Sequence, residues 1–224
     1  MTKIADGVIY KYYEHYPCFG KGSFFIGYSI INYMNNFEDK KEKVAVYIDG
    51  SNFYNYLQDK EINFPRGTKF NFKDFIDYLV GDRECVSRRY YTGVFRNIDG
   101  TPKSEKLVKG QQKFFTNIEK DGFIVKRGRI MPVKGVYKEK GTDVKIAVDL
   151  VIGAVDEYYD TAILVSSDTD LIPAIKYIKY RRKKLEYVGF AHAPSLGIQK
   201  YAYLSMLLLP KDIEKFKEKT LFSN

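Results

Sequence analysis

The sequence predicts an α/β fold of three layers, in which helices cover both faces of a mainly parallel sheet. Three observations carry this prediction. Short apolar strand patterns alternate with longer helical patterns after residue 34, as in βαβ units. Two of the strand patterns, 44–48 and 161–165, are almost wholly apolar, as expected of strands buried on both faces. Apolar residues make up 45% of the 224-residue chain, enough for a packed core.

Local patterns define the elements in the first half of this fold. The run KVAVYID at 43–49 is short and rich in β-branched residues, which is typical of a strand. In the next segment Phe53, Tyr56 and Leu57 recur at helical spacing and indicate a core-facing helix. In order, we expect a strand at 43–49, helices at 51–60 and 71–80, a strand at 85–95, a loop at 96–106 and a helix from 104 to 122.

The second half continues the alternation. The run FIVKRGRIMPV alternates between apolar and polar residues, as a half-buried strand does. The run TDVKIAVDLVIGAV is a largely apolar helix, and TAILV is a strand buried on both faces. In order, we expect a strand at 123–133, a helix at 142–155, a strand at 161–167, a helix at 170–184, a strand at 185–190, and short elements at 195–202, 204–209 and 212–219.

Residues 1–33 differ from the rest of the chain. They contain many aromatic residues and show neither the period of a strand nor that of a helix. We therefore predict two parts, an atypical extension at 1–33 and one folded domain at 34–224. Two interpretations of the extension stay open: an upstream stretch ahead of a natural start at Met34, or a genuine arm of the protein.

Charge and composition narrow the class of function. The net charge of +9 favours an anionic partner, most simply nucleic acid. Cys18 and Cys85 have no metal-ligand or disulfide spacing, which is typical of a cytoplasmic protein. With only His15 and His192 present, carboxylates are the expected catalytic groups. No stretch reaches the ~20 apolar residues of a membrane helix, so we expect no membrane partner.

Four aspartates stand where a parallel sheet binds its ligands. Asp49 ends the first strand, Asp168 and Asp170 follow the strand at 161–165, and Asp143 begins a helix. Ligands of open α/β sheets bind beyond the carboxyl ends of the strands. If these two strands are neighbours at the centre of the sheet, the aspartates converge in one crevice. Sites made only of carboxylates favour Mg²⁺ or Mn²⁺, which can activate water against a phosphate.

Each of these aspartates also has a purely structural interpretation. Asp49 precedes Gly50-Ser51-Asn52 and can be a turn residue or a helix N-cap. Asp143 can complement the positive end of its helix, and Asp168 can cap the helix that follows it. Taken singly, capping is the commoner role. Taken together, capping requires three separate caps to lie at one edge of the sheet by coincidence.

The motifs DGSNFY (49–54), KGTDVKIAVDLV (140–151) and LVSSDTDLIPAI (164–175), in this order, resemble the NYN domain, a family of the PIN-like nuclease superfamily. The resemblance covers roughly 43–190 and rests on all three motifs at this spacing. It implies a Rossmann-like, PIN-like α/β/α sandwich with a parallel sheet of about five strands. It also implies metal-dependent cleavage of RNA at an acidic pocket.

The same resemblance assigns roles to individual residues. Asp49, Asp143 and Asp168 match the acids that bind Mg²⁺ or Mn²⁺. Asn52 matches an asparagine that helps to position the acidic site. Together with Asp170, these are the residues that we expect to carry catalysis. If the family mechanism holds, cleavage leaves a 5′-phosphate and a 3′-hydroxyl.

Other matched positions have supporting roles. Asp170 matches a second acid that binds the metal through water or orients a neighbour. Ser166 and Ser167 match small polar residues that hydrogen-bond to the site. Asp149 falls where an acid is frequent, but it lies about 240° around the helix from Asp143, so we interpret it as a structural residue or one that supports the site.

The chain departs from the PIN-like pattern at one point. Nucleases of this type often have a further acid between the first and third motifs. Glu84, Asp99 and Glu105 are possible substitutes, and none of them lies in a recognisable motif. The number of bound metals, one or two, therefore stays open.

Basic residues cluster outside the acidic segments, in KRGR (126–129) and KYRRKK (179–184), with Arg88 and Arg89 on another strand. Neutralising phosphates with such residues makes binding depend strongly on salt, although KYRRKK can equally be a solvated helix end. The candidates for nucleic-acid contact are Lys126, Arg127, Arg129, Lys179, Arg181 and Arg182. The aromatic residues Tyr90, Tyr91 and Phe95 can stack on bases, but on a strand they more often fill the core.

These observations favour a cytoplasmic, metal-dependent ribonuclease that hydrolyses phosphodiesters, with endonucleolytic cleavage of single-stranded RNA as the expected mode. The main alternative is a non-catalytic module of the same fold that binds RNA or a protein. A phosphohydrolase that forms a covalent aspartate intermediate is less favoured, because the second acid two residues after Asp49 is absent. A homodimer is left open.

Overall fold

The computed structural model describes residues 2–5, 8–11, 41–65, 68–95, 100–133 and 136–218. The chain divides into two compact units, residues 1–40 and 41–224. In the first unit β1 (Thr2–Ala5) pairs antiparallel with β2 (Val8–Lys11). The predicted boundary between residues 33 and 34 lies outside the described residues.

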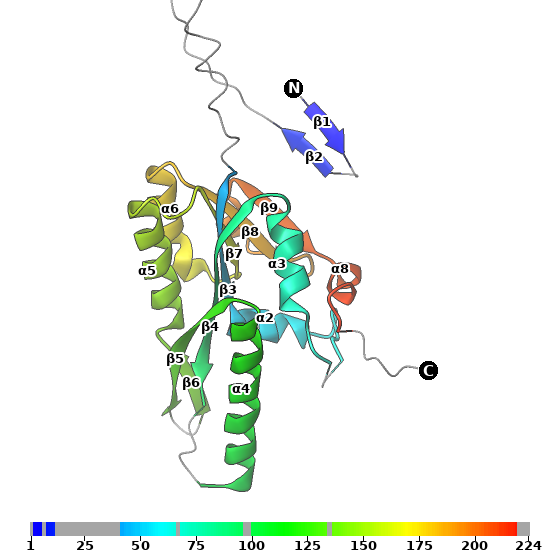
Figure 1. Ribbon diagram of the computed structural model, residues 1–224, viewed down its shortest axis with the longest axis vertical. Helices are drawn as coiled ribbons and strands as arrows, with labels where there is room; N and C mark the ends of the chain where they lie inside the picture. Colours follow the sequence, from blue (N-terminus) through cyan, green and yellow to red (C-terminus); the bar gives the residue numbers. More distant parts are fainter. Residues whose placement is uncertain are drawn as a thin grey trace, which may run out of the picture. The chain divides into compact units, whose positions relative to one another are not determined.

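The second unit is built on one twisted sheet. Its described strands have the order β6-β5-β4-β3-β7-β8-β9 (Figure 1). All neighbours are parallel except β5 and β6, which are antiparallel. The strands are β3 (Lys43–Asp49), β4 (Glu84–Val94), β5 (Phe123–Val133), β6 (Val136–Lys140), β7 (Thr161–Val165), β8 (Lys184–Phe190) and β9 (Leu204–Leu208). The predicted α/β class with a mainly parallel sheet is confirmed, with seven strands instead of about five.

Helices cover both faces of this sheet, so the unit has three layers (Figure 1). The helices are α2 (Gly50–Leu57), α3 (Phe72–Val80), α4 (Pro102–Lys120), α5 (Thr142–Val155), α6 (Ile172–Tyr180), α7 (Leu196–Gln199) and α8 (Pro210–Glu214), and η1 (Thr169–Leu171) is a short 3₁₀ turn. Side chains of α2, α3, α4 and α8 pack on one face of the sheet, and those of α5, α6 and α7 pack on the other. Within the described part of the chain, no helix is both long and apolar enough to cross a membrane.

The central strand β3 shows why the layers form. Its side chains alternate between the two faces, as the period of a strand requires. Val46 and Ile48 pack with Phe53, Phe72 and other aromatic residues on the α2–α3–α4 face. Tyr47 packs on the opposite face with residues of α5 and α6. Both faces of β3 are therefore buried, as its apolar sequence predicts.

The differences from the sequence prediction include one added strand and two shifted helix ends. The strand β6 was not predicted, because its charged sequence VYKEK has no apolar period and it forms by pairing with β5. Helix α4 begins at Pro102, inside the predicted loop, where the Thr101 side chain accepts a hydrogen bond from the Ser104 backbone N–H. Helix α6 ends at Tyr180, four residues early, because Lys184 already belongs to β8.

Strand order brings the predicted site segments together. The strands β3 and β7 are direct neighbours, with Ile48 opposite Val165, so the expectation that they pair is confirmed. Asp49 and the segment after Val165 therefore emerge at the same edge of the sheet, which we call the carboxyl edge. Strands β4 and β5 run past Asp49 at this edge, because Tyr91 is level with Asp49 and β4 continues to Val94. The opposite edge, where β3, β7 and β8 begin, is called the amino edge.

Candidate functional site

Asp49 lies at the centre of the carboxyl edge and has two roles at once. It is the N-cap of α2, because its Oδ1 atom accepts a hydrogen bond of 3.1 Å from the Asn52 backbone N–H. Its Oδ2 atom accepts a second one, also 3.1 Å long, from the Ser166 hydroxyl after β7. The structural interpretation of Asp49 as a cap is therefore correct, but it does not account for the surroundings of the carboxylate.

Those surroundings disfavour a negative charge. The Asp49 residue is only 8% exposed. Burial raises the pKa of Asp49 to about 6, against the opposing effect of the hydrogen bonds from Asn52 and Ser166, and the charges of Glu139 and Asp168 raise it further. A helix cap needs neither burial nor like charges nearby. The carboxylate is thus held in an environment that stability alone does not require.

The segment after β7 is tied to α2 by hydrogen bonds. The Ser167 backbone N–H donates to the Asn52 side-chain oxygen at 3.1 Å, which joins the two motifs that flank Asp49. The Ser166 hydroxyl both donates to Asp49 and accepts from the Asp168 backbone N–H at 3.2 Å. The Ser167 hydroxyl is 3.0 Å from the Tyr187 hydroxyl on β8. Asn52, Ser166 and Ser167 therefore hold the backbone of the site in place.

Glu139 is a site residue that the sequence analysis missed. It lies on β6, and its carboxylate accepts hydrogen bonds from the hydroxyls of Ser51 on α2 and Thr142 on α5. These bonds place its charge close enough to Asp49 to raise the pKa of that residue. Glu139 precedes the motif KGTD directly, and this position was the signal available in the sequence. Without β6, nothing in the sequence linked it to Asp49.

Two glycines make room for Glu139 on the sheet. A Cβ atom at Gly93 on β4 would lie 3.1 Å from the Glu139 side chain and 2.7 Å from Ile130. A Cβ atom at Gly128 on β5 would lie 2.3 Å from the Thr142 hydroxyl oxygen. Only a residue without a side chain allows this approach at both positions. The sheet surface is thus shaped to receive Glu139 and the start of α5.

The described candidates for a further acid, Glu84 and Glu105, have other surroundings than Asp49. Glu84 begins β4 and is level with Lys43, so it lies at the amino edge, away from Asp49. Glu105 is an exposed residue of α4 that forms an ion pair with Lys109. Asp99 lies outside the described residues. Glu139, and neither of the described candidates, is the additional acid whose charge acts on Asp49.

The carboxylates of Asp143, Asp168 and Asp170 lie in the segments around Asp49, but they do not converge with it on one point. Asp143 is in the first turn of α5, on the same side as the buried residues Ile146 and Leu150. Asp168 is the N-cap of η1, and its Oδ1 accepts a 2.9 Å hydrogen bond from the backbone N–H of the exposed Asp170. Across the described residues, no three acidic, histidine or cysteine side chains stand close enough to enclose a metal ion.

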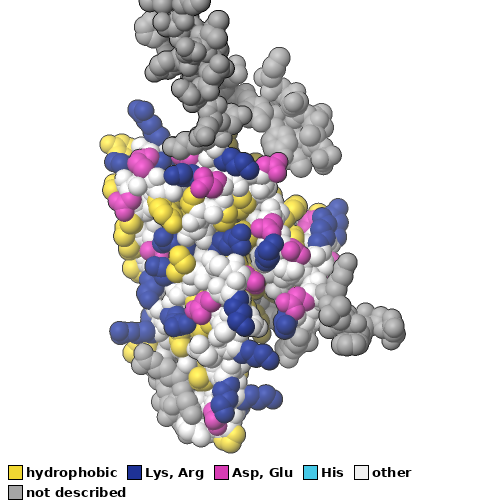
Figure 2. All heavy atoms as spheres, in the orientation of Figure 1, with side chains coloured by type: hydrophobic (Ala, Val, Ile, Leu, Met, Phe, Trp, Pro, Cys, Tyr) yellow, Lys and Arg dark blue, Asp and Glu magenta, His cyan; other side chains and the backbone are white. Residues whose placement is uncertain are grey.

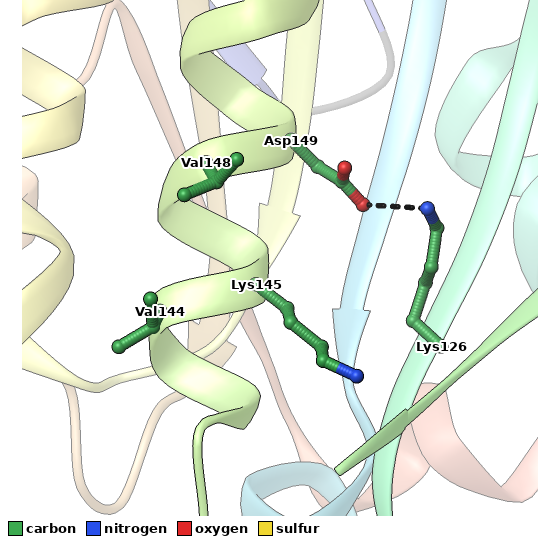
Figure 3. Close-up of a pocket in the computed structure, with 5 residues that line it drawn as sticks. All are labelled: Lys126, Val144, Lys145, Val148 and Asp149. Carbon is green, nitrogen blue, oxygen red and sulfur yellow. Dashed lines mark ion pairs between the residues drawn. The ribbon is translucent and has the colours of Figure 1, made fainter.

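Asp149, further along α5, lies among cations (Figure 3). Its Oδ2 atom accepts a hydrogen bond of 2.7 Å from the Tyr91 hydroxyl and is 3.0 Å from the Arg89 guanidinium and 3.3 Å from the Lys126 ammonium. Although burial opposes ionisation, these partners hold the pKa of Asp149 below its usual range. The Asp149 cluster is an ion-pair network in which two cations surround one carboxylate, in contrast to the surroundings of Asp49.

The six predicted basic residues fall into two separate places. Lys179, Arg181 and Arg182 lie at the C-terminal end of α6, just before Lys184, which is level with the first residue of β7. They are therefore at the amino edge, opposite Asp49. Lys126, Arg127 and Arg129 lie on the part of β5 that passes the acidic site, from the level of Tyr91 onward. The six residues do not form one surface.

Helix α4 adds a basic surface that the sequence analysis did not name. Its residues Lys106, Lys109 and Lys113 are exposed and recur at helical spacing. They lie opposite the buried Phe115, on the solvent side of the helix. Figure 2 shows dark-blue side chains along this part of the molecule. We call these three residues the α4 lysine row.

The aromatic residues of β4 alternate between the two faces of the sheet, as the two-residue period of a strand predicts. Tyr90 and Tyr91 are buried on opposite faces of the sheet, in the two halves of the core. Phe53 is also buried, and Tyr56 packs against the same cluster. Phe95, at the end of β4, is 38% exposed and is the one member of the predicted stacking group that reaches solvent.

Comparison with known proteins agrees with this architecture. The family model of the NYN domain matches residues 43–203, and the chain therefore belongs to the NYN domain family, whose fold is PIN-like and of the nuclease type. A crystal structure of a protein of unknown function from Vibrio parahaemolyticus is similar, with a TM-score of 0.58 and 25% sequence identity. The similarity covers 76% of this chain and 95% of the Vibrio chain. No curated protein matches the chain.

Proposed function

We propose that this chain is a ribonuclease that hydrolyses RNA phosphodiesters with the help of Mg²⁺ or Mn²⁺ at the carboxyl edge. Membership of the NYN domain family supports a nuclease-type protein. The main observation that supports this site is the burial of the Asp49 carboxylate next to the negative charges of Glu139 and Asp168. This arrangement opposes stability unless a cation offsets it.

The residues present suit a hard cation. Every candidate ligand is a carboxylate, the donor that Mg²⁺ and Mn²⁺ prefer. In the described part of the chain no three of these carboxylates are close enough to enclose an ion. Asp49, Glu139 and Asp168 would therefore have to draw closer together to hold it, and Asp143 lies in the first turn of the neighbouring helix. A bound Mg²⁺ or Mn²⁺ would supply an activated water and would offset charge on the phosphate.

The chain's own groups prepare the site for this role. Ser166 and the Asn52 backbone N–H hold the two oxygens of Asp49, and Ser51 and Thr142 hold Glu139. Carboxylates fixed by such bonds need little reorganisation when charge develops in a reaction. Asp170, which is exposed and bonded only through its backbone to Asp168, has the role of orienting that neighbour in this proposal.

RNA would be held by cations beyond the acidic edge. Arg129 on β5 and the α4 lysine row are exposed on elements that extend past Asp49. Arg127 is engaged by Glu119 at 3.1 Å and Lys126 by Asp149. Lys109 of the α4 lysine row is engaged by Glu105, so these three cations are less available to phosphates. Contacts of this kind bind the backbone without regard to sequence. Phe95 at the end of β4 offers a ring for an unpaired base.

The direct test is cleavage of single-stranded RNA by the full chain in Mn²⁺ or Mg²⁺. We expect cutting that stops with chelator, and products that carry a 5′-phosphate. Asp49→Asn and Glu139→Gln keep the size of the side chain and remove one charge each, so we expect losses of about 10–100-fold or more in cleavage rate. Both variants should bind RNA as tightly as the wild type.

The matched control is Asp82→Asn. Asp82 is an exposed acid in the turn that leads into β4 at the amino edge, so the same chemical change there should leave cleavage unaltered. Thermal unfolding of each variant would show whether a loss of activity reflects a loss of fold. Equal rates for the wild type and Asp49→Asn would refute this site.

A non-catalytic RNA-binding module is the second candidate. Two observations favour it. Asp49 and Asp168 both serve as caps, and no three of the described acidic side chains are close enough to enclose a metal ion. Such a module would bind RNA without cleaving it in any divalent metal. Calorimetric titration separates the two candidates, because only the nuclease should take up Mn²⁺ in a manner that Asp49→Asn abolishes.

A further inference from the structure

Helix α5 carries apolar side chains on the side that faces solvent. Its exposed residues are Val144, Lys145, Val148, Ile152 and Val155. The four aliphatic ones are 59%, 47%, 51% and 42% exposed in that order. They recur at helical spacing and form one row along the helix, which we call the α5 row. A helix that covers a sheet normally has a polar outer face, so this row needs an explanation.

The α5 row has the properties of a helix–helix contact. Valine and isoleucine are branched at Cβ and lose little rotamer freedom when they are packed. The row extends over nearly the whole of α5, which begins at Thr142 and ends at Val155. A contiguous exposed apolar surface of this kind marks an interaction site. Figure 2 shows hydrophobic side chains along the edge of the molecule that α5 occupies in Figure 1.

Two charges flank this row, and each stands at the wrong end of the helix. Lys145 lies near the N-terminal end of α5, and Asp156 is its C-cap residue. Helix dipoles favour acids at the N-terminal end and cations at the C-terminal end. Both positions are therefore unfavourable in an isolated chain. A neighbour that brings an acid to Lys145 and a cation to Asp156 would reverse this.

A second copy of the same helix supplies both partners. Lys145 and Asp156 are eleven residues apart, which places them about 20° apart around the helix and roughly 16 Å apart along it. They thus flank the α5 row on the same side at opposite ends. If two α5 helices pack antiparallel about a twofold axis, Lys145 of each copy faces Asp156 of the other. Val148 then faces Ile152, and Val144 faces Val155.

The surroundings of Lys145 leave room for this acid. Val144, Lys145 and Val148 line a pocket of about 230 Å³ between α5 and β5, together with Lys126 and Asp149 (Figure 3). Val144 and Val148 point to one side of the helix, whereas Lys145 and Asp149 turn toward Lys126. Asp149 pairs with Lys126, and Lys145 donates to the Arg127 backbone carbonyl. An ammonium has three donors, so Lys145 retains capacity for a carboxylate.

We propose that this chain forms a homodimer in which α5 packs antiparallel against α5 of a second copy, with Lys145 of each copy paired to Asp156 of the other. The apolar α5 row forms the centre of the interface. The charge pairs at its rim set the antiparallel direction. The proposal does not depend on ribonuclease activity, since it concerns association of the chain alone.

The first test measures the mass of the full chain by sedimentation equilibrium. At micromolar concentrations we expect association toward twice the chain mass of 26.1 kDa. Val148→Glu places a charge at the centre of the row and should weaken association by at least about tenfold. Tyr180→Glu, at an exposed position at the end of α6, is the matched control and should leave association unchanged.

The second test uses charge reversal and mixing. Lys145→Asp alone and Asp156→Lys alone each place like charges at both ends of the pair, so each variant should dimerise more weakly than the wild type. A mixture of the two variants should recover association, because the mixed dimer has two opposite-charge pairs. This recovery requires contact between two copies. The weaker association of each single variant distinguishes antiparallel from parallel packing, because parallel helices would already place like charges together in the wild type. Circular dichroism of each variant checks that the fold is intact.

Three results would overturn the proposal. The wild type could remain a monomer at about 100 µM, well above the concentrations at which a specific interface associates. Val148→Glu could dimerise as the wild type does. The mixture of charge variants could stay as weakly associated as its components. Occupation of the row by residues 1–40 or by another protein would produce the first of these results.

Discussion

Acidic side chains have opposite surroundings at the two edges of the sheet. At the amino edge, Arg83 contacts Glu186 at 2.7 Å and Glu42 at 3.8 Å, and Lys184 contacts Glu42 at 2.9 Å. Glu42 and Glu186 there each have a cation as a partner. At the carboxyl edge, Asp49, Glu139 and Asp168 accept hydrogen bonds from hydroxyl and amide groups, and their charges repel one another.

The pKa values follow this difference. Against the effect of its partial burial, the hydrogen bond from Thr161 and the charges of Lys184 and Arg83 lower the pKa of Glu42. Burial and like charges raise that of Asp49. Opposite charges at the amino edge stabilise the fold. At the carboxyl edge the buried charge of Asp49 and the like charges beside it lower the stability, and a bound cation would offset this repulsion. This contrast indicates that the functional site lies at the carboxyl edge, and three experiments test it.

The largest expected effect is on the pH dependence of stability without metal. The pKa of Asp49 is 3.8 in the unfolded chain and about 6 in the folded one. Between these values the folded state binds more protons, so the free energy of unfolding falls as pH rises toward 6 and stays low above it. The loss is up to about 3 kcal/mol. Asp49→Asn should escape this loss, so its advantage over the wild type grows across this range.

Urea unfolding in chelator across this pH range measures the difference. Adding Mn²⁺ at neutral pH should then restore stability to the wild type but not to Asp49→Asn, because only the wild type offers the full set of carboxylates. Parallel stability curves for the two proteins would mean that Asp49 is not strained by its surroundings, and the contrast between the edges would lose its main support.

The next effect concerns the amino edge. Arg83 pairs with Glu186 and also donates to the backbone carbonyls of Leu79 and Val80 at the end of α3. Arg83→Met keeps the apolar stem and leaves these acceptors unpaired, so we expect a loss of about 2 kcal/mol in the free energy of unfolding. RNA cleavage by the folded protein should not change. Lys73→Met, which removes an exposed pair with Asp77, is the control and should unfold like the wild type.

The smallest effect compares two basic surfaces. Replacing the α4 lysine row (Lys106, Lys109 and Lys113) by glutamine should weaken RNA binding by about tenfold at moderate salt and reduce the salt slope by about 2. The same change at Lys179, Arg181 and Arg182, at the amino edge, should have less effect on both. Fluorescence anisotropy with labelled single-stranded RNA measures both quantities. A larger loss from the second variant would place RNA at the amino edge and contradict the proposed path.

The sequence alone determined the local elements and the identity of the main acids. The bounds of β5 and α5 agree with those predicted because apolar period, glycine and capping residues act within a few positions. Asp49 and Asp168 were found because they stand at or just beyond the carboxyl ends of apolar strands. That both strands are central followed from their being apolar on two faces, whereas their direct pairing was only a possibility that the structure then showed.

Only the tertiary structure decided which distant residues share the site. Glu139 reaches Asp49 because β6 pairs with the end of β5, and pairing between strands depends on contacts that a charged edge sequence does not announce. The run at 179–184 was separated from the site because α6 returns across the sheet and ends at the amino edge. Sequence patterns indicate which residues form a helix or strand and where it begins and ends. The edge of the sheet at which its residues finally lie depends on how the whole sheet packs.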